Sequence, residues 1–172
     1  MPAMMTACDK PAKLGAPDAI EHKPVRIVDS IVSAVSSARR KVADVTFAPR
    51  FEQVPTGTTL ASPDMLNRAI TDLLVTAACH TPPGGQVKVA ISQGAGRIAI
   101  DILAQGKTLP PGDLDTFFDV ARQRTLHRGG SDFGHDPALT PRGLRLFEGT
   151  AFVRNGSTEG IVIEVLLPLE SS

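Results

Sequence analysis

The sequence predicts a single α+β domain in which strands paired as hairpins alternate with helices. Two observations lead to this prediction. A long amphipathic helix with marked ends occupies the middle of the chain, and segments of alternating apolar and polar residues occur in pairs around short turns. Hairpins placed between helices favour a mainly antiparallel sheet over a doubly wound parallel one. With 172 residues, the chain is long enough for one well-buried core and short for two.

The central helix is expected over about residues 63–79. Ser62 supplies an N-cap and Pro63 a first-turn proline, and the sequence TPPGG from Thr81 cannot continue a helix. The apolar residues in between recur at intervals of three and four, which places them on one face: Leu66, Ala69, Ile70, Leu73, Leu74 and Ala77. One side of this helix should therefore belong to the core.

The segments before and after the central helix continue the pattern. A short strand should lead into an amphipathic helix with apolar residues from Val25 to Ala38, followed by a strand over Val45–Arg50 and a loop over residues 51–62. After the central helix, two alternating segments flank a Gly-Ala-Gly turn and predict a hairpin over residues 86–103. Its inward side chains should be Val87, Val89, Ile91, Ile98, Ile100 and Ile102, with Lys88 and Asp101 facing solvent.

The last third of the chain predicts two helices and a closing hairpin. The helices are expected over residues 112–124 and about 138–148, and Pro141 should shorten or kink the second one. The closing strands are expected over residues 151–154 and 161–167. At the other end of the chain, residues 1–22 are rich in alanine and proline without periodicity, so we expect a disordered leader before a domain spanning residues 23–170.

Composition excludes several classes of function. The chain has 18 basic and 18 acidic residues, so its bulk charge does not favour a nucleic acid or an anionic membrane as partner. Two cysteines make no disulfide framework, and no apolar run approaches a membrane span, so a cytoplasmic location is the default. Two histidines and two aspartates in the TLHRGGSDFGHDP segment could suggest a metal site, but their spacing fits no known ligand motif and we expect a polar loop without metal.

The order of residues in the central helix resembles a known motif. The sequence DLLVTAACHTPPGG, from Asp72 to Gly85, resembles the N box of histidine-kinase ATPase domains, which belong to the GHKL superfamily with gyrases and heat-shock chaperones. The segments AQGKTLP, from Ala104, and GGSDFG, from Gly129, lie where these domains carry their adenine-binding box and the glycines of their ATP lid. This resemblance covers about residues 23–168 and implies the Bergerat architecture, a two-layer α/β sandwich whose mixed, mostly antiparallel sheet carries helices on one face.

The resemblance also implies roles for individual positions. Asp72 takes the place of the polar residue that positions a water or the γ-phosphate, and Thr76 takes that of the asparagine that ligates Mg²⁺, although a hydroxyl is a poor ligand for a hard cation. Gly106 matches the first glycine of the adenine-binding box. Gly130 and Gly134 match glycines of the lid. The resemblance implies that these five residues form a nucleotide site for ATP or ADP with Mg²⁺. We expect this site to be vestigial, because Ala104 replaces the aspartate that accepts a hydrogen bond from adenine.

Two functional hypotheses follow, together with a structural alternative. The first is a degenerate ATPase domain that binds or regulates partners in bacterial two-component signalling, with weak or no ATP binding; a response regulator or a histidine-kinase dimerisation domain would be its partner, and a homodimer is a further option. The second is an enzyme, either the nucleotide-binding subunit of a split histidine kinase or a stand-alone anti-sigma-type Ser/Thr kinase. The third is a fragment of a larger kinase. None of the four histidines has the helical-hairpin context of a phosphoacceptor, so we do not expect a complete autophosphorylating kinase.

Overall fold

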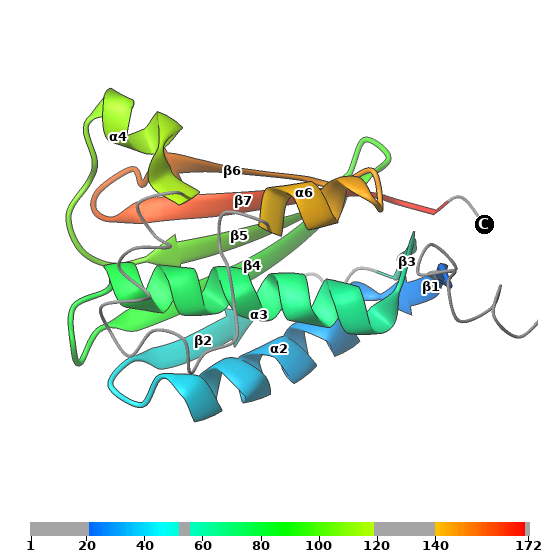
Figure 1. Ribbon diagram of the computed structural model, residues 1–172, viewed down its shortest axis with the longest axis horizontal. Coiled ribbons are helices and arrows are strands. Elements are labelled where there is room, and N and C mark those ends of the chain that lie inside the picture. The colour runs from blue at the N-terminus through cyan, green and yellow to red at the C-terminus, as the bar shows by residue number, and fades with distance from the viewer. Residues whose placement is uncertain (1–20, 52–55, 119–139, 171–172) are drawn as a thin grey trace, which may run out of the picture.

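The computed structural model describes residues 21–51, 56–118 and 140–170, which form two layers, a sheet and the helices packed on it (Figure 1). A two-stranded ribbon lies beside the main sheet. The elements in chain order are β1 (Lys23–Arg26), α2 (Ile27–Lys41), β2 (Thr46–Arg50), β3 (Thr58–Ala61), α3 (Pro63–His80), β4 (Gln86–Gly94), β5 (Arg97–Ala104), α4 (Pro111–Asp115), α6 (Thr140–Arg145), β6 (Thr150–Asn155) and β7 (Ile161–Pro168).

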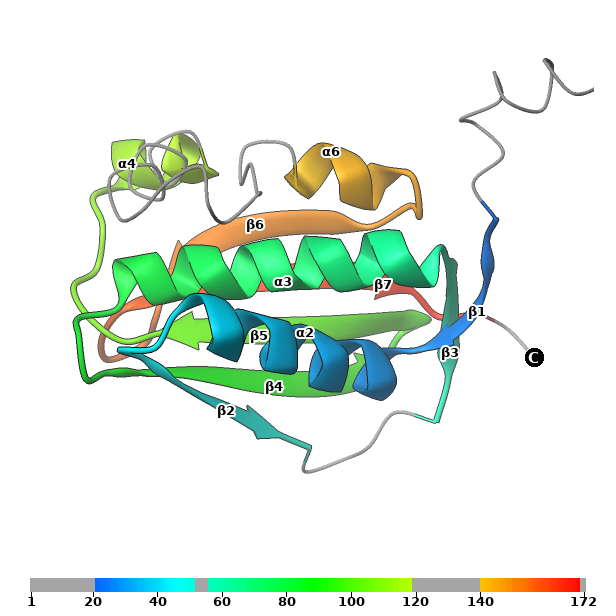
Figure 2. The ribbon, with the colours of Figure 1, turned by 60° about the horizontal axis from the view of Figure 1, so that its bottom comes forward.

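The main sheet has five strands in the order β2-β4-β5-β7-β6. β2 pairs with β4 in parallel, and the other neighbours pair antiparallel, so the sheet is mixed and mostly antiparallel. Helices α2 and α3 lie side by side across one face of this sheet (Figure 2). The expected α+β class and the Bergerat-type sandwich are therefore confirmed.

The core lies between the helices and the sheet. Period-two alternation sends every second side chain of β4 and β5 toward the helices, and the six inward residues expected from the sequence are all buried: Val87, Val89, Ile91, Ile98, Ile100 and Ile102. The side chains of Lys88 and Asp101 lie on the other face and are half-buried.

The central helix α3 agrees with the sequence prediction to within one residue. The Ser62 hydroxyl accepts from the Met65 N–H at 3.5 Å, and Pro63 is the first helical residue. At the other end, the Thr81 N–H donates to the carbonyls of Ala77 and Ala78 at 3.1 Å, which closes the last turn before the prolines. The expected apolar face is buried along the length of the helix.

Two expectations near the N-terminus need correction. Val25 belongs to β1 and not to the helix, and the expected loop over residues 51–62 contains the strand β3. These two short strands pair with each other, with Lys23 opposite Ala61 and Arg26 opposite Thr58. Each strand has only four residues and finds its partner more than thirty positions away, so no local pattern could reveal the pairing.

The helices of the last third are only partly described. α4 spans Pro111–Asp115, with Phe117 buried just beyond it, and residues 119–124 of the helix expected over residues 112–124 lie outside the described residues. α6 spans Thr140–Arg145, so Pro141 lies in its first turn, where a proline costs no hydrogen bond. The leader up to residue 20 and the whole of the expected lid also lie outside the described residues. No helix in the described part of the chain is long and apolar enough to cross a membrane.

Candidate functional site

Asp72 and Thr76 lie one turn apart on α3, on the same side of the helix. Both are buried, with 8% and 1% of their surfaces exposed. The Thr76 hydroxyl donates to the backbone carbonyl of Asp72 at 2.7 Å. Threonine often makes this i−4 hydrogen bond inside a helix. It turns the hydroxyl toward the helix's own backbone, so the proton of this group is already used within α3.

Ala104, at the end of β5, is completely buried. It lies opposite Val87 on β4 and Ile161 on β7. The turn that enters β7 packs directly on it, because a Cβ added to Gly160 would lie 1.9 Å from the Ala104 carbonyl oxygen. The Gly160 N–H also donates to the Gly106 carbonyl at 2.8 Å. The end of β5 is thus held under the β6–β7 turn by backbone contacts.

Gly106 has a φ of +130°, which side chains rarely adopt. A Cβ at this position would lie 3.4 Å from the His80 carbonyl oxygen and 3.4 Å from a ring carbon of Pro82. Both are ordinary van der Waals distances, so the positive φ, and not a close approach, favours glycine where the loop after β5 passes the C-terminal end of α3.

His80 joins the end of α3 to the two segments that follow β5. Its Nε2 lies 3.1 Å from the Lys107 carbonyl oxygen, at hydrogen-bond distance. Its ring packs edge-on against Phe117, with centroids 6.2 Å apart, and Phe117 packs in the same way against Phe118 at 5.3 Å. The C-terminal end of α3 therefore contacts both the loop over residues 104–110 and the segment just after α4.

Asn155 is a positioning residue that the sequence did not reveal. Its side-chain oxygen accepts from the Leu109 N–H and its amide nitrogen donates to the Leu109 carbonyl, both at 2.8 Å. This pair of bonds fixes the loop after β5 against the end of β6. In the sequence, Asn155 opens the segment NGSTEG, where an asparagine is also typical of a turn. The signal for this role of Asn155 would have been that the backbone N–H and carbonyl of Leu109 need a side-chain partner, and only the fold shows that need.

The remaining predicted site residues lie outside the described part of the chain. Gly130 and Gly134 belong to residues 119–139, as do the histidines and aspartates considered for metal binding, so these expectations stay predictions. Within the described residues, no group of three or more histidine, cysteine, aspartate or glutamate side chains could hold a metal ion. The structure brings Asp72 and Thr76 together on α3, and Gly106 lies near His80, one turn beyond Thr76 at the C-terminal end of the same helix.

An open pocket between Asp72, Ala104 and Gly106 is what nucleotide binding would require. Cavities of about 600, 330, 520 and 370 Å³ lie on the described surface, and none of them is lined by Asp72, Thr76, Ala104 or Gly106. The largest of these four lies at the opposite end of α3, beside β3 and α6.

The sandwich of a mixed five-stranded sheet and helices on one face is the fold of histidine-kinase ATPase domains. The family model for histidine kinase-, DNA gyrase B- and HSP90-like ATPases matches residues 61–171. The chain therefore belongs to this family.

Solved structures support the same fold. A mycobacterial sensor histidine kinase, MprB, is 24% identical over 88% of this chain and 99% of its own, with a TM-score of 0.68. The ATP-binding domain of PrrB from Mycobacterium tuberculosis gives 24% identity, the same coverage and a TM-score of 0.67. The catalytic domain of the histidine kinase ThkA gives 14% identity over 86% of this chain and 95% of its own, with a TM-score of 0.68. No curated protein sequence matches the chain significantly.

Proposed function

We propose that this chain is a degenerate histidine-kinase-type ATPase domain that acts as a binding or regulatory module in bacterial two-component signalling, with weak or no ATP binding. Membership of the family supports the signalling context, since the solved structures it resembles are histidine kinases. The observation that carries the proposal is Ala104. Where the family has an aspartate for adenine, this chain has a fully buried methyl group under the β6–β7 turn.

The loss at Ala104 removes an acceptor that a nucleotide base would need. A methyl group cannot accept a hydrogen bond from the adenine amino group, and a buried polar group left without its partner costs about 1–3 kcal/mol. This loss weakens adenine binding.

The loss at Thr76 adds to that at Ala104. Mg²⁺ prefers carboxylate and phosphate oxygens and gives up its waters reluctantly. A single hydroxyl that already donates within its own helix is a poor replacement for an amide oxygen. The two changes affect different parts of a bound nucleotide, so their costs should add approximately.

The proposed partner is a protein of the signalling system. A response regulator or a histidine-kinase dimerisation domain fits the family, and a homodimer is a further option. Balanced charge, with 18 basic and 18 acidic residues, gives no support to nucleic acid or an anionic membrane. We place the protein in the cytoplasm, where such partners act.

Calorimetric titration of ATP and ADP, with and without Mg²⁺, tests the proposal. The expected result is no saturable heat at millimolar nucleotide, and the same result for Asp72→Ala. Saturable, magnesium-dependent binding that Asp72→Ala weakens would overturn it.

The same titration decides the enzymatic alternative. Asp72 and Gly106 are retained at their family positions, so a split histidine kinase or an anti-sigma-type Ser/Thr kinase would use them to hold ATP. In that case the partner would supply the phosphoacceptor, and ATP-dependent phosphate transfer to it would be measurable with radiolabelled nucleotide.

A further inference from the structure

At the end of α3 opposite to His80, the surface carries a groove of about 600 Å³ lined by both apolar and polar side chains. We define the α6 groove by the apolar side chains Leu60, Leu146, Phe147 and Leu169 and the carboxylates of Glu148 and Glu170. We propose that the α6 groove is a docking site for a basic amphipathic segment of a partner protein. This inference deepens the proposed function and rests on it only for the expectation that the partner is a protein.

Exposed leucines are the first observation. Leu60 on β3 is 47% exposed and Leu146, just after α6, is 50% exposed, and both line the α6 groove. Only two other large apolar side chains of the described residues are comparably exposed, Val32 and Phe152, and neither lines the groove. Exposed apolar side chains that cluster beside a concave surface are typical of an interaction site, whereas isolated exposed apolar side chains are common on any protein surface.

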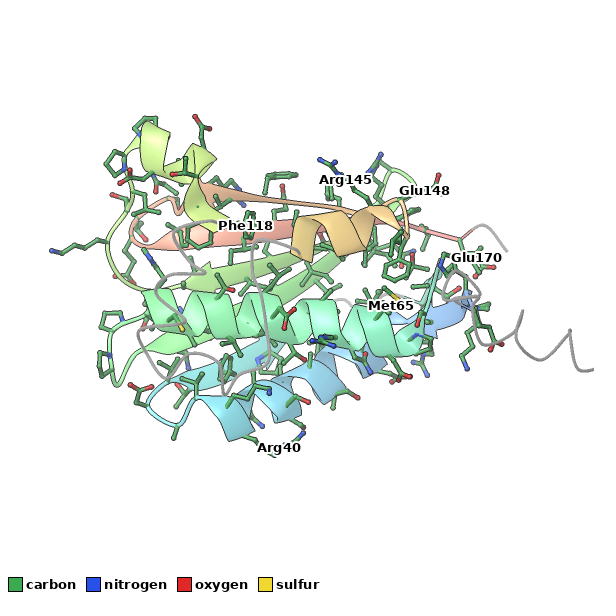
Figure 3. The ribbon with its side chains drawn as sticks, in the orientation of Figure 1. Arg40, Met65, Phe118, Arg145, Glu148 and Glu170 are labelled. Atoms are coloured by element: carbon green, nitrogen blue, oxygen red, sulfur yellow. The ribbon has the colours of Figure 1, made fainter. Side chains whose placement is uncertain are left out.

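The charge of the groove selects the partner. Its lining includes two glutamates and one histidine, His22, and no lysine or arginine. Figure 3 shows Glu148 and Glu170 at the same end of the molecule, beside β3 and the C-terminal end of the described chain. Carboxylates beside exposed leucines attract lysine and arginine and repel phosphate groups. A basic protein segment therefore fits, and an anionic lipid surface or a nucleic acid does not.

The backbone at Glu148 is the third observation. This residue has a φ of +59°, in the left-handed region that non-glycine residues rarely adopt. It follows α6 at the point where helices commonly end with a glycine, and the next N–H, of Gly149, donates back to the Leu144 carbonyl at 2.8 Å. Glycine would relieve the strain at residue 148. A strained residue that displays a carboxylate over the groove points to a use for that carboxylate.

One wall of the groove is fixed before any partner binds. The Leu169 N–H donates to the Gly96 carbonyl at 2.9 Å, and the Glu170 N–H donates to the Thr58 carbonyl at 2.7 Å. The Thr58 hydroxyl also donates to the Glu170 carboxylate at 2.7 Å. A preformed wall lowers the entropic cost of docking, because fewer groups must be ordered on binding.

Binding of a designed peptide to the full chain tests the proposal. The probe is a fluorescently labelled 18-residue amphipathic peptide of leucine and lysine, and its counterpart replaces every lysine with glutamate. Anisotropy should show saturable binding of the leucine–lysine peptide and none of the leucine–glutamate peptide. Replacing both groove leucines, Leu60→Ser with Leu146→Ser, should weaken binding at least about tenfold, since the apolar surface that the peptide would bury is lost.

The chain offers matched controls. Val32→Ser on α2 removes an equally exposed apolar side chain and should leave the affinity unchanged. Glu148→Gly should weaken peptide binding several-fold and at the same time raise the thermal midpoint by about 2–4 °C, because it relieves the left-handed strain. A purely structural Glu148 would not combine these two effects. Equal weakening by Val32→Ser, or unchanged affinity in the double leucine variant, would overturn the proposal.

The same samples also test two other occupants of the α6 groove. Self-association of the wild-type chain that the double leucine variant loses would assign the groove to a second copy. A synthetic peptide of residues 1–20 that displaced the leucine–lysine peptide at lower concentration than unlabelled probe would assign it to the chain's own leader. Either result would overturn the partner proposal. Nucleotide calorimetry reports separately on the proposed function, so failure of one is distinguishable from failure of the other.

Discussion

The two ends of α3 present opposite surfaces. At the His80 end, backbone contacts join the loop after β5 to the β6–β7 turn, and His80 contacts both this loop and Phe117, just after α4. At the Pro63 end, the α6 groove leaves two leucines half exposed between carboxylates. Figure 1 places these two regions at opposite ends of the sandwich, next to α4 and next to β1 and β3.

This difference agrees with the proposed function. At the His80 end, the Thr76 hydroxyl donates within α3 and Ala104 is a buried methyl group. The groove at the other end needs no nucleotide to present its surface. The comparison predicts that changes at the first end mainly affect folding stability, while changes at the second mainly affect binding.

The largest effect on stability is expected for Gly160→Ala, at the His80 end of α3. Its Cβ would lie 1.9 Å from the Ala104 carbonyl oxygen, and its φ of +68° is unfavourable for alanine. The backbone of the turn must move, so we expect a loss of at least about 3 kcal/mol in the free energy of unfolding, measured by urea denaturation.

Gly96→Ala is the matched control for this prediction. Gly96 has a φ of +73°, but a Cβ there would meet nothing within 4 Å. This variant should lose only the conformational term, about 1 kcal/mol. Similar losses at both glycines would mean that the end of β5 is not tightly covered, and the contrast between the two ends would fail.

The second prediction restores the family's acid with Ala104→Asp. A carboxyl group placed at this fully buried position lacks solvent, so we expect a loss of about 2 kcal/mol or more and no gain in ATP binding. Ala99→Asp on the same strand is the control, since Ala99 is only half-buried and should tolerate the change. A stable Ala104→Asp variant that binds ATP would show that the His80 end of α3 can still form a nucleotide site.

A smaller effect is expected for Asn155→Ala. Loss of both hydrogen bonds to Leu109 should cost about 1–2 kcal/mol and loosen the loop after β5, measurable as faster amide hydrogen exchange there. Asn67→Ala on α3 is the control, because the side-chain oxygen of Asn67 is buried without a hydrogen-bond partner. Unchanged exchange in the loop would show that other contacts hold it.

The sequence predicted the fold better than the site, for physical reasons. Period-two and three-to-four-residue spacing reflect local geometry, so α3, β4 and β5 were placed to within a residue or so. The β1–β3 pair and the Asn155–Leu109 bonds depend on partners distant in the chain, and no local pattern records them. The family motif indicated which positions to compare, but the packing of Gly160 on Ala104 needed the assembled sheet.

The smallest effect is expected in the middle of the sheet, between the two ends of α3. It also provides a control for pH experiments on the α6 groove. Glu164 on β7 lies directly opposite Asp101 on β5, on the face without helices. Burial raises the pKa of Glu164 above its ordinary value of 4.5, and the neighbouring charge of Asp101 raises it further, although Arg154 acts in the opposite direction. Between pH 4.5 and the raised pKa, the folded chain holds more protons than the unfolded chain, so stability should fall as the pH rises through this window.

Urea denaturation from pH 4 to pH 8 measures this fall. Glu164→Gln should remove it and leave the variant more stable than wild type above the window, and Asp101→Asn should lessen it by removing the second cause of the shift. An unchanged slope in both variants would place the titrating group elsewhere. Because Glu164→Gln removes this contribution to stability, peptide binding by the variant can be measured over the same pH range without it.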